Sequence, residues 1–88
     1  MAEGDEMTIL QGAQPRLRGV RVGVHRVGEP GGVATARLLL RDGDQRRKVD
    51  LTYGNPIDLL GRGTMELVAV HRPTAGQQSA AVTIRLCD

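Results

Sequence analysis

The side chains best suited to metal binding or nucleophilic chemistry are few in this sequence. The 88-residue chain has two histidines, His25 and His71, one cysteine, Cys87, and one tyrosine, Tyr53. A zinc site takes three or four protein ligands, and the strand pairing predicted below places Cys87 far from His71. A lone cysteine makes no internal disulfide. The sequence therefore predicts no metal site, no cofactor and no disulfide framework.

Anion binding is a second kind of chemistry, and the stretch RLRGVRVGVHRVGEPGG at residues 16–32 points to it. Its valines alternate with arginine, glycine and histidine, so that a strand here would carry its polar side chains on one face. The candidates for a basic face on this sheet are Arg21, His25, Arg37 and Lys48. Such a face can bind nucleic acid or another anion, but it is also the ordinary wet face of an antiparallel sheet.

Three observations weigh against nucleic acid as the partner. The chain contains no Phe and no Trp, and single strands are usually held by stacking their bases on aromatic side chains. Asp50 is expected to lie opposite Arg37 and to neutralise it. The formal net charge of +2 is also small for a protein that binds a phosphate backbone. We therefore expect a solvated face, with nucleic-acid or anion binding as the alternative.

Sequence motifs of catalysis are absent. The chain has no phosphate-binding Walker loop, no dinucleotide-binding fingerprint and no nucleophile elbow, and its glycines fall at predicted turns. Asp58 and Glu66 are predicted to lie opposite each other, and two such carboxylates could share a proton for acid–base work. Arg85 beside Glu66 favours an ordinary surface salt bridge instead. The sequence thus favours a protein without enzymatic activity.

Short strands are the elements that must position these side chains. No segment keeps a helical period, and Gly and Pro recur about every ten residues between short alternating apolar runs, which is typical of all-β proteins. The predicted strands are residues 6–11, 16–27, 33–41, 45–53, 57–60, 64–72 and 79–87. We expect an antiparallel two-sheet sandwich of about six or seven strands or, as the alternative, a small closed β-barrel. A single domain over residues 6–88 is expected to follow a disordered N-terminus at residues 1–5.

The turns set the registers between these strands. A GEPGG turn with Gly28 opposite Gly32, and a two-residue Gly43-Asp44 turn, give one consistent sheet. The predicted pairs are Val24–Ala36, Val22–Leu38, Val20–Leu40, Leu38–Val49, Arg37–Asp50, Leu59–Met65, Ile57–Leu67, Met65–Leu86, Leu67–Ile84 and Ala69–Val82. The predicted outer rows are Arg21–Leu39–Lys48, Gly23–Arg37–Asp50 and His25–Thr35–Thr52. Each register brings apolar residues to one face, as a buried face requires.

A hollow interior would offer a different function. Tyr53 and His71 are expected to point inward and are the candidates for lining a cavity. A small β-barrel with such a cavity could bind an apolar metabolite, or act on it in the manner of a cyclase, through shape and a few polar groups.

An outward apolar patch is the candidate contact surface. In the stretch ELVAVHR at residues 66–72 both alternating sets of side chains are apolar. Val68 and Val70 would then face outward beside Ala81, as the candidates for an interface. The alternative is a bulge at Ala69 that returns Val70 to the core.

The middle and the end of the chain resemble a family of small β-rich proteins of unknown function from GC-rich bacteria. The stretches that carry the resemblance are ATARLLLR, KVDLTYGNPIDLLGRGTMELVAV and AAVTIRL, within residues 16–87. The resemblance implies a bacterial protein with a β-fold, and it transfers no site residue.

The functional expectation is a small interaction or accessory module that self-associates as a homodimer, with a protein partner as a further option. The metabolite-binding barrel and the basic face are its alternatives. The chain has no apolar signal region and no long apolar run, so we expect neither a leader nor a membrane partner. With one cysteine and no disulfide framework, we expect a cytoplasmic location.

Overall fold

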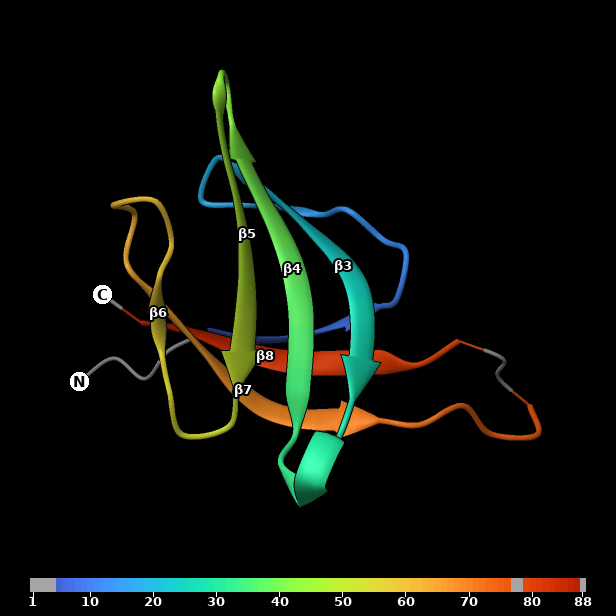
Figure 1. Cartoon of the computed structure of the whole chain (residues 1–88). Helices are drawn as coiled ribbons and strands as arrows, with labels where there is room; N and C mark the ends of the chain where they lie inside the picture. The colour runs from blue at the N-terminus through green and yellow to red at the C-terminus, as the bar shows by residue number, and fades with distance from the viewer. Residues whose placement is uncertain (1–4, 77–78, 88) are drawn as a thin grey trace.

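Two antiparallel four-stranded sheets make up the structure, a computed structural model that describes residues 5–76 and 79–87 (Figure 1). The strands are β1 (Asp5–Leu10), β2 (Arg16–Leu17), β3 (Val20–Gly28), β4 (Thr35–Asp42), β5 (Gln45–Thr52), β6 (Ile57–Asp58), β7 (Thr64–His71) and β8 (Ala81–Cys87). One sheet has the order β1-β8-β7-β6 and the other the order β2-β3-β4-β5. The sheets do not close into a barrel, so the predicted all-β sandwich is confirmed.

The core lies between the two sheets, whose strands run across each other in Figure 1. Alternate residues of each strand point inward, because successive side chains of a strand face opposite sides. The largest fully buried side chains are Val20, Val22, Val24, Leu38, Leu40, Leu51, Leu59, Met65, Val82 and Ile84. Among the described residues no polar or charged residue is buried. Aliphatic side chains and methionine therefore fill the interior in place of aromatic rings.

Two bulges occur where the spacing of inward residues changes from two to three. In β3 the register with β4 shifts between Val24 and Arg26, so that Val27 packs against the same core as Val24. In β7 the register with β8 shifts between Leu67 and Ala69, so that Val70 packs against the core as well. A bulge adds one residue to one strand and so reverses which side chains face inward. The structure thus adopts the predicted alternative, a bulge that returns Val70 to the core, but the extra residue is Val68 and not Ala69.

Two of the predicted registers are confirmed, that between β4 and β5 and that of the first part of β7 with β8. Arg37 pairs with Asp50, and Leu38 with Val49, across the tight turn between β4 and β5. The first part of β7 pairs as expected, with Met65 opposite Leu86.

The register between β3 and β4 was predicted wrongly, by two residues up to Val24 and by three residues beyond the bulge. Val24 pairs with Leu38, and Gly28 lies opposite Thr35. The connection is longer than the predicted turn, because it contains the 3₁₀ turn η1 (Pro30–Gly32). Up to Val24, the shift of two residues leaves the side chains on their predicted faces and changes only which residues are neighbours. Beyond the bulge the shift is three residues, and the faces of the β3 side chains are exchanged.

The register between β6 and β7 is likewise two residues from the prediction. Ile57 pairs with Met65, and the peptide N–H of Leu59 donates to the carbonyl of Gly63 at 2.8 Å. Leu59 therefore belongs to a longer turn. Of the predicted disordered N-terminus, residues 1–4 lie outside the described residues, and Asp5 begins β1. Within the described part of the chain there is no helix with the length and apolar character to cross a membrane.

Two arginines join the turns of the two sheets. Arg18, in the β2–β3 turn, donates to the carbonyls of Arg62 at 3.1 Å and Cys87 at 3.3 Å. Arg62, in the β6–β7 turn, donates to the carbonyl of Arg18 at 2.8 Å and to Asp42 Oδ2 at 2.8 Å. Gly63 has φ +122°, and a Cβ there would lie 2.6 Å from the carbonyl oxygen of Cys87, so only glycine fits this junction without strain.

Candidate anion-binding face

A row of four arginines crosses the whole β2-β3-β4-β5 sheet. Arg16 pairs with Arg21, Arg21 with Arg41, and Arg41 with Arg46, so that each of the four strands contributes one arginine. Directly opposite residues in antiparallel strands project from the same face. Leu17, Val22 and Leu40, beside them in sequence, are buried in the core. The row therefore lies on the outer face, where all four residues are exposed.

The arginine row has no counter-charge of its own. Within the described part of the chain, none of the four forms a salt bridge or a side-chain hydrogen bond. Like charges directly opposite each other on a sheet are destabilising. An anion from outside the chain would relieve this repulsion by binding to the row.

A shallow groove of about 320 Å³ runs along part of the row. Its lining residues are Arg16, Gly19, Arg21, Arg41, Asp42 and Gly43. The carboxylate of Asp42 is bonded to Arg62, at 2.8 Å. Asp42 is therefore paired with Arg62, which is not a member of the row.

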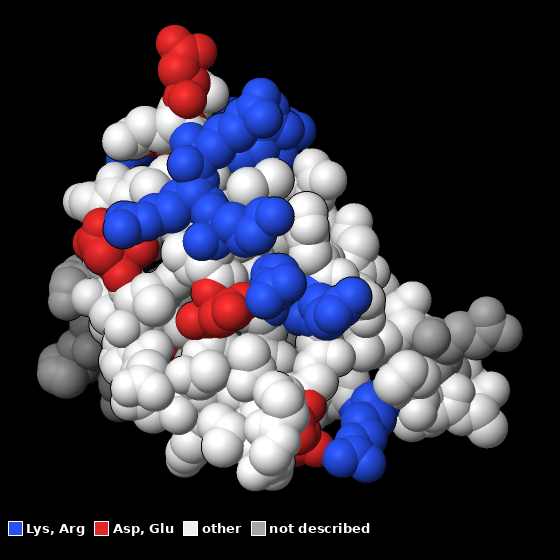
Figure 2. Space-filling view, in the orientation of Figure 1, with Lys and Arg blue, Asp and Glu red and all other residues white. Residues whose placement is uncertain are grey.

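The basic surface is concentrated toward the β4–β5 turn. Figure 2 shows Lys and Arg side chains gathered over that end of the face formed by β3, β4 and β5. Lys48 lies on the same face, opposite Leu39, and Arg26 lies opposite Arg37. Among the described residues, the half of the sheet nearest the β4–β5 turn therefore carries most of the cations without an ion pair, and Arg26 adds one farther from that turn.

Farther from that turn, Asp50 neutralises one cation. Arg37 Nε donates to Asp50 Oδ1 at 3.0 Å. This hydrogen bond lowers the pKa of Asp50 and raises that of Arg37. The neutralisation of Arg37 was expected from the sequence.

The structure places the predicted basic residues as follows. Arg21 and Lys48 lie on the outer face as expected, but their neighbours differ from the prediction. Arg21 lies opposite Arg41. Lys48 lies opposite Leu39, which in turn lies opposite Gly23. His25 does not lie opposite Thr35, because the bulge in β3 removes it from the regular pairing.

Sequence reasoning missed three members of the row. Arg16, Arg41 and Arg46 were not among the predicted residues. The tight turn Gly43-Asp44 already sets Arg41 opposite Arg46, so that pair was within reach of the sequence. The joining of this pair to Arg21 depends on the longer η1 connection, whose register the sequence did not reveal.

A second groove, of about 550 Å³, adjoins the row along β3. Its lining residues are Gln11, Gly12, Ala13, Gln14, Gly23, Val24, His25 and Ser79. The segment before β2 lies alongside β3, since the N–H of Val24 donates to the carbonyl of Ala13 at 3.1 Å. The side chain of Gln11 donates to the carbonyl of His25 at 3.1 Å.

The predicted cavity between Tyr53 and His71 does not form. Tyr53 is 64% exposed. His71 is exposed too, and its Nε2 lies 2.8 Å from Thr83 Oγ1. The bulge in β7 turns His71 outward, and the side chains of Leu38 and Leu51 fill the interior. The prediction that both residues point inward was wrong.

The predicted outward valine patch does not form either. Val70 packs against the core because of the bulge, Ala81 is buried at 6% exposure, and Val68 is half-buried. The outer face of this sheet carries polar side chains instead, among them Thr8 and Thr83, whose hydroxyls lie 2.8 Å apart.

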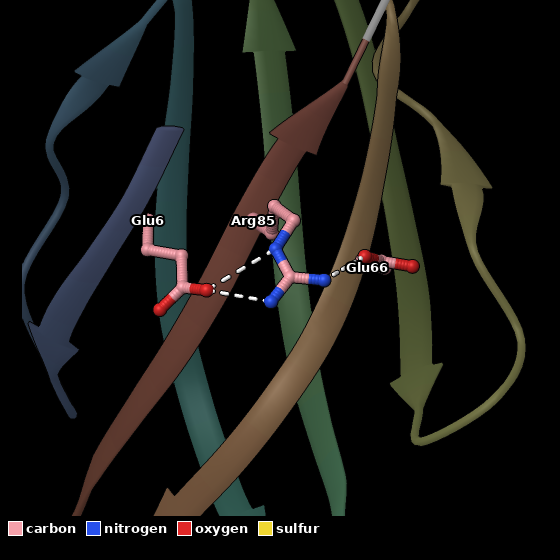
Figure 3. A network of polar contacts seen from close by, with 3 residues as sticks. All are labelled: Glu6, Glu66 and Arg85. Carbon is pink, nitrogen blue, oxygen red and sulfur yellow. Dashed lines mark hydrogen bonds and ion pairs between the residues drawn. The ribbon is translucent and has the colours of Figure 1, made fainter. Parts of the chain in front are cut away.

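A charged network occupies the same outer face (Figure 3). Arg85 donates to Glu6 Oε2 through Nη2 at 2.6 Å and to Glu66 Oε1 through Nη1 at 2.8 Å. These bonds raise the pKa of Arg85, with Glu6 as the larger cause. Glu66 does not face Asp58, which pairs with Thr64 and accepts the N–H of Gly61 at 2.8 Å. The two carboxylates therefore do not form a pair for acid–base chemistry.

The remaining candidate chemistry involves metals and thiols. Among the described residues there is no group of three or more His, Cys, Asp or Glu side chains that could hold a metal ion. Cys87 is a half-buried free thiol.

A comparison with known proteins finds no matching family model, no matching curated protein and no matching solved structure. The candidate face therefore has to be interpreted from its own geometry and charge.

Proposed function

We propose that the protein is a binding module that holds the phosphate backbone of a nucleic acid on the arginine row. The observation that carries this proposal is the alignment of Arg16, Arg21, Arg41 and Arg46 across one sheet face, with no salt bridge to the described residues. The planar guanidinium group donates two parallel hydrogen bonds to a phosphate. Four arginines in line can therefore hold consecutive phosphates.

The length of the row favours an extended polyanion over a single small anion. Neighbouring strands lie about 4.8 Å apart, so a row across four strands spans roughly 14 Å at the backbone. The long side chains extend this reach further. We place this module in the cytoplasm, where nucleic acids occur and where a single free cysteine, Cys87, stays reduced.

The salt dependence of binding tests the proposal. Binding of a fluorescent single-stranded 12-mer is measured by anisotropy over a range of salt concentrations. For single strands the slope of log K against log salt is roughly −0.7 per phosphate contact, so four contacts give a slope of about −3. The double variant Arg41→Gln/Arg46→Gln is expected to reduce this slope by about 1.4.

Arg47→Gln is the matched control. Arg47 follows Arg46 on β5 and is equally exposed, but it pairs with the buried Leu40 and so lies on the opposite side of the strand. This variant is expected to keep the slope of the unmodified protein. Equal slopes for the double variant and the control, or no binding of the 12-mer at low salt, would overturn the proposal.

A further inference from the structure

We infer that the groove beside His25 receives one unstacked base of a single-stranded nucleic acid while the arginine row holds the adjoining phosphates. This inference rests on the proposed function and adds a ligand class to it. It assigns a base-binding role to Gly23, His25 and Gln14, which line the groove.

The groove and the row lie next to each other on the same face of β3. Gly23 lies two residues beyond Arg21 on that face, which is about 6.7 Å along a strand. On the neighbouring segment, Gln14 lies two residues before Arg16, and the N–H of Val22 donates to the carbonyl of Pro15 at 2.8 Å. One strand and one bonded segment therefore build both the phosphate row and the groove.

The absence of a side chain at Gly23 leaves the floor of the groove open. A Cβ at this position would lie 3.4 Å from Cγ of Gln14 and 3.8 Å from the ring of His25. A Cβ there would therefore be in ordinary van der Waals contact with both side chains. The groove volume of about 550 Å³ falls within the range of roughly 300–1,000 Å³ that is usual for small-molecule sites.

The side chains around Gly23 have the chemistry to hold a base. His25 is exposed at the bulge, and among the described residues its ring has no hydrogen-bond partner. Imidazole rings stack on unpaired bases, and polar side chains bond to the base edges. The amide of Gln14, which also has no partner in the described part of the chain, offers both a donor and an acceptor.

The arrangement fits a single strand better than a duplex. In a duplex the bases are stacked and paired, and only a base free of its neighbours can enter a groove and lie against a ring. The chain has no Phe and no Trp, and in the described part of the chain His25 provides an aromatic ring in the groove beside the row. We therefore assign one base to each protein molecule.

A pair of oligonucleotides tests this inference. An eight-nucleotide oligothymidine and an abasic strand of the same length carry the same phosphates and differ only in their bases. The unmodified protein is expected to bind oligothymidine about tenfold more tightly, because a single stacked base contributes on this scale. The variants His25→Ala and Gly23→Val are expected to remove this tenfold difference and to leave the affinity for the abasic strand unchanged.

Gly28→Val is the matched control for Gly23→Val. Gly28 lies on the same strand and does not line the groove, and a Cβ added there would meet no atom within 4 Å. This variant is expected to keep the preference for oligothymidine. His25→Ala alters only an exposed side chain, so its result stands even if Gly23→Val fails to fold.

The outcomes separate the inference from the proposed function. If the unmodified protein binds both strands equally, with the salt slope intact, the base-binding role is overturned and the phosphate row stands. If His25→Ala keeps the preference for oligothymidine, the groove is likewise excluded as the base site. If neither strand binds at low salt, both proposals are overturned.

Discussion

At the scale of single residues, Asp50 limits the charge of the basic face. Its carboxylate is bonded to Arg37 Nε at 3.0 Å and to Nη2 at 3.4 Å. Both side chains are about half exposed, so the pair contributes little to the free energy of unfolding. Its main effect is to neutralise Arg37, a cation of the basic face that lies outside the arginine row.

The lowered pKa of Asp50 predicts a pH-dependent contribution to stability. Because the folded-state pKa lies below the ordinary value of 3.8, the pair stabilises the fold at pH values above 3.8 and stops doing so as the pH falls through the folded-state pKa. At pH 6 the unmodified protein is therefore expected to have a slightly higher urea midpoint than the variant Asp50→Asn. The difference should shrink as the pH is lowered from about 4 toward about 2.

Asp44→Asn serves as the control for this measurement. Asp44 lies in the β4–β5 turn and makes no salt bridge within the described residues. Its substitution should produce no such pH-dependent difference. A gap between the protein and Asp50→Asn that is equally large at both ends of the pH range would contradict the prediction.

At the scale of elements, the two bulges decide which side chains face the core and which face solvent. The spacing Val20, Val22, Val24 and then Val27 signals the bulge in β3, and Met65, Leu67 and then Val70 signals the one in β7. In each strand a bulge is the only way for all these residues to reach one core. The sequence carries this signal for both strands, but a bulge was predicted only for β7, as one of two alternatives.

The bulge in β7 predicts unequal effects of two neighbouring truncations. Val70 packs against the core, whereas Val68 is half-buried outside that cluster. Val70→Ala is expected to lower the free energy of unfolding by about 1–2 kcal/mol, since it removes buried methyl groups. Val68→Ala should cost less than about 1 kcal/mol. Chemical denaturation measures both, and the reverse order would contradict the observed register.

The sequence predicted the sheets better than it predicted the site. Alternation and the tight Gly43-Asp44 turn were enough to assign the faces and to pair Arg37 with Asp50. The longer, glycine-rich connection between β3 and β4 allows several registers that differ by two residues, and all of them bury the same valines. The partner of Arg21 was therefore undetermined. The His25 groove was also beyond reach, because it depends on a segment without periodicity that lies along β3.

At the scale of the whole molecule, one junction joins the two sheets and protects the charge of the basic face. Arg18 and Arg62 bond to each other's carbonyls, and Arg62 also bonds to Asp42. Without Arg62, the carboxylate of Asp42 would be free to turn toward the cations that line the same groove. The junction thus contributes to stability and to the positive potential of the row.

Replacement of Arg62 is expected to affect both properties. Arg62→Ala should lower the free energy of unfolding by about 1 kcal/mol, because it removes charge-assisted hydrogen bonds at a partly exposed site. It should also weaken oligonucleotide binding, because Asp42 is released beside the row. Arg62→Lys can keep the charge pair with Asp42, although it lacks the guanidinium fork.

The comparison of these two variants separates the effects. Arg62→Lys is expected to lose stability and to keep most of its affinity for the 12-mer, as measured by denaturation and anisotropy. If Arg62→Ala binds the oligonucleotide as tightly as the unmodified protein, Asp42 has no influence on the row.

The arginine row has a consequence for how the protein responds to ionic strength. In the free protein the four guanidinium groups repel one another across the sheet, and dissolved ions screen that repulsion. Salt should therefore raise the melting temperature of the free protein while it dissociates the complex with a nucleic acid. At low salt the bound strand takes over the role of the screening ions, so that folding and binding become thermodynamically linked.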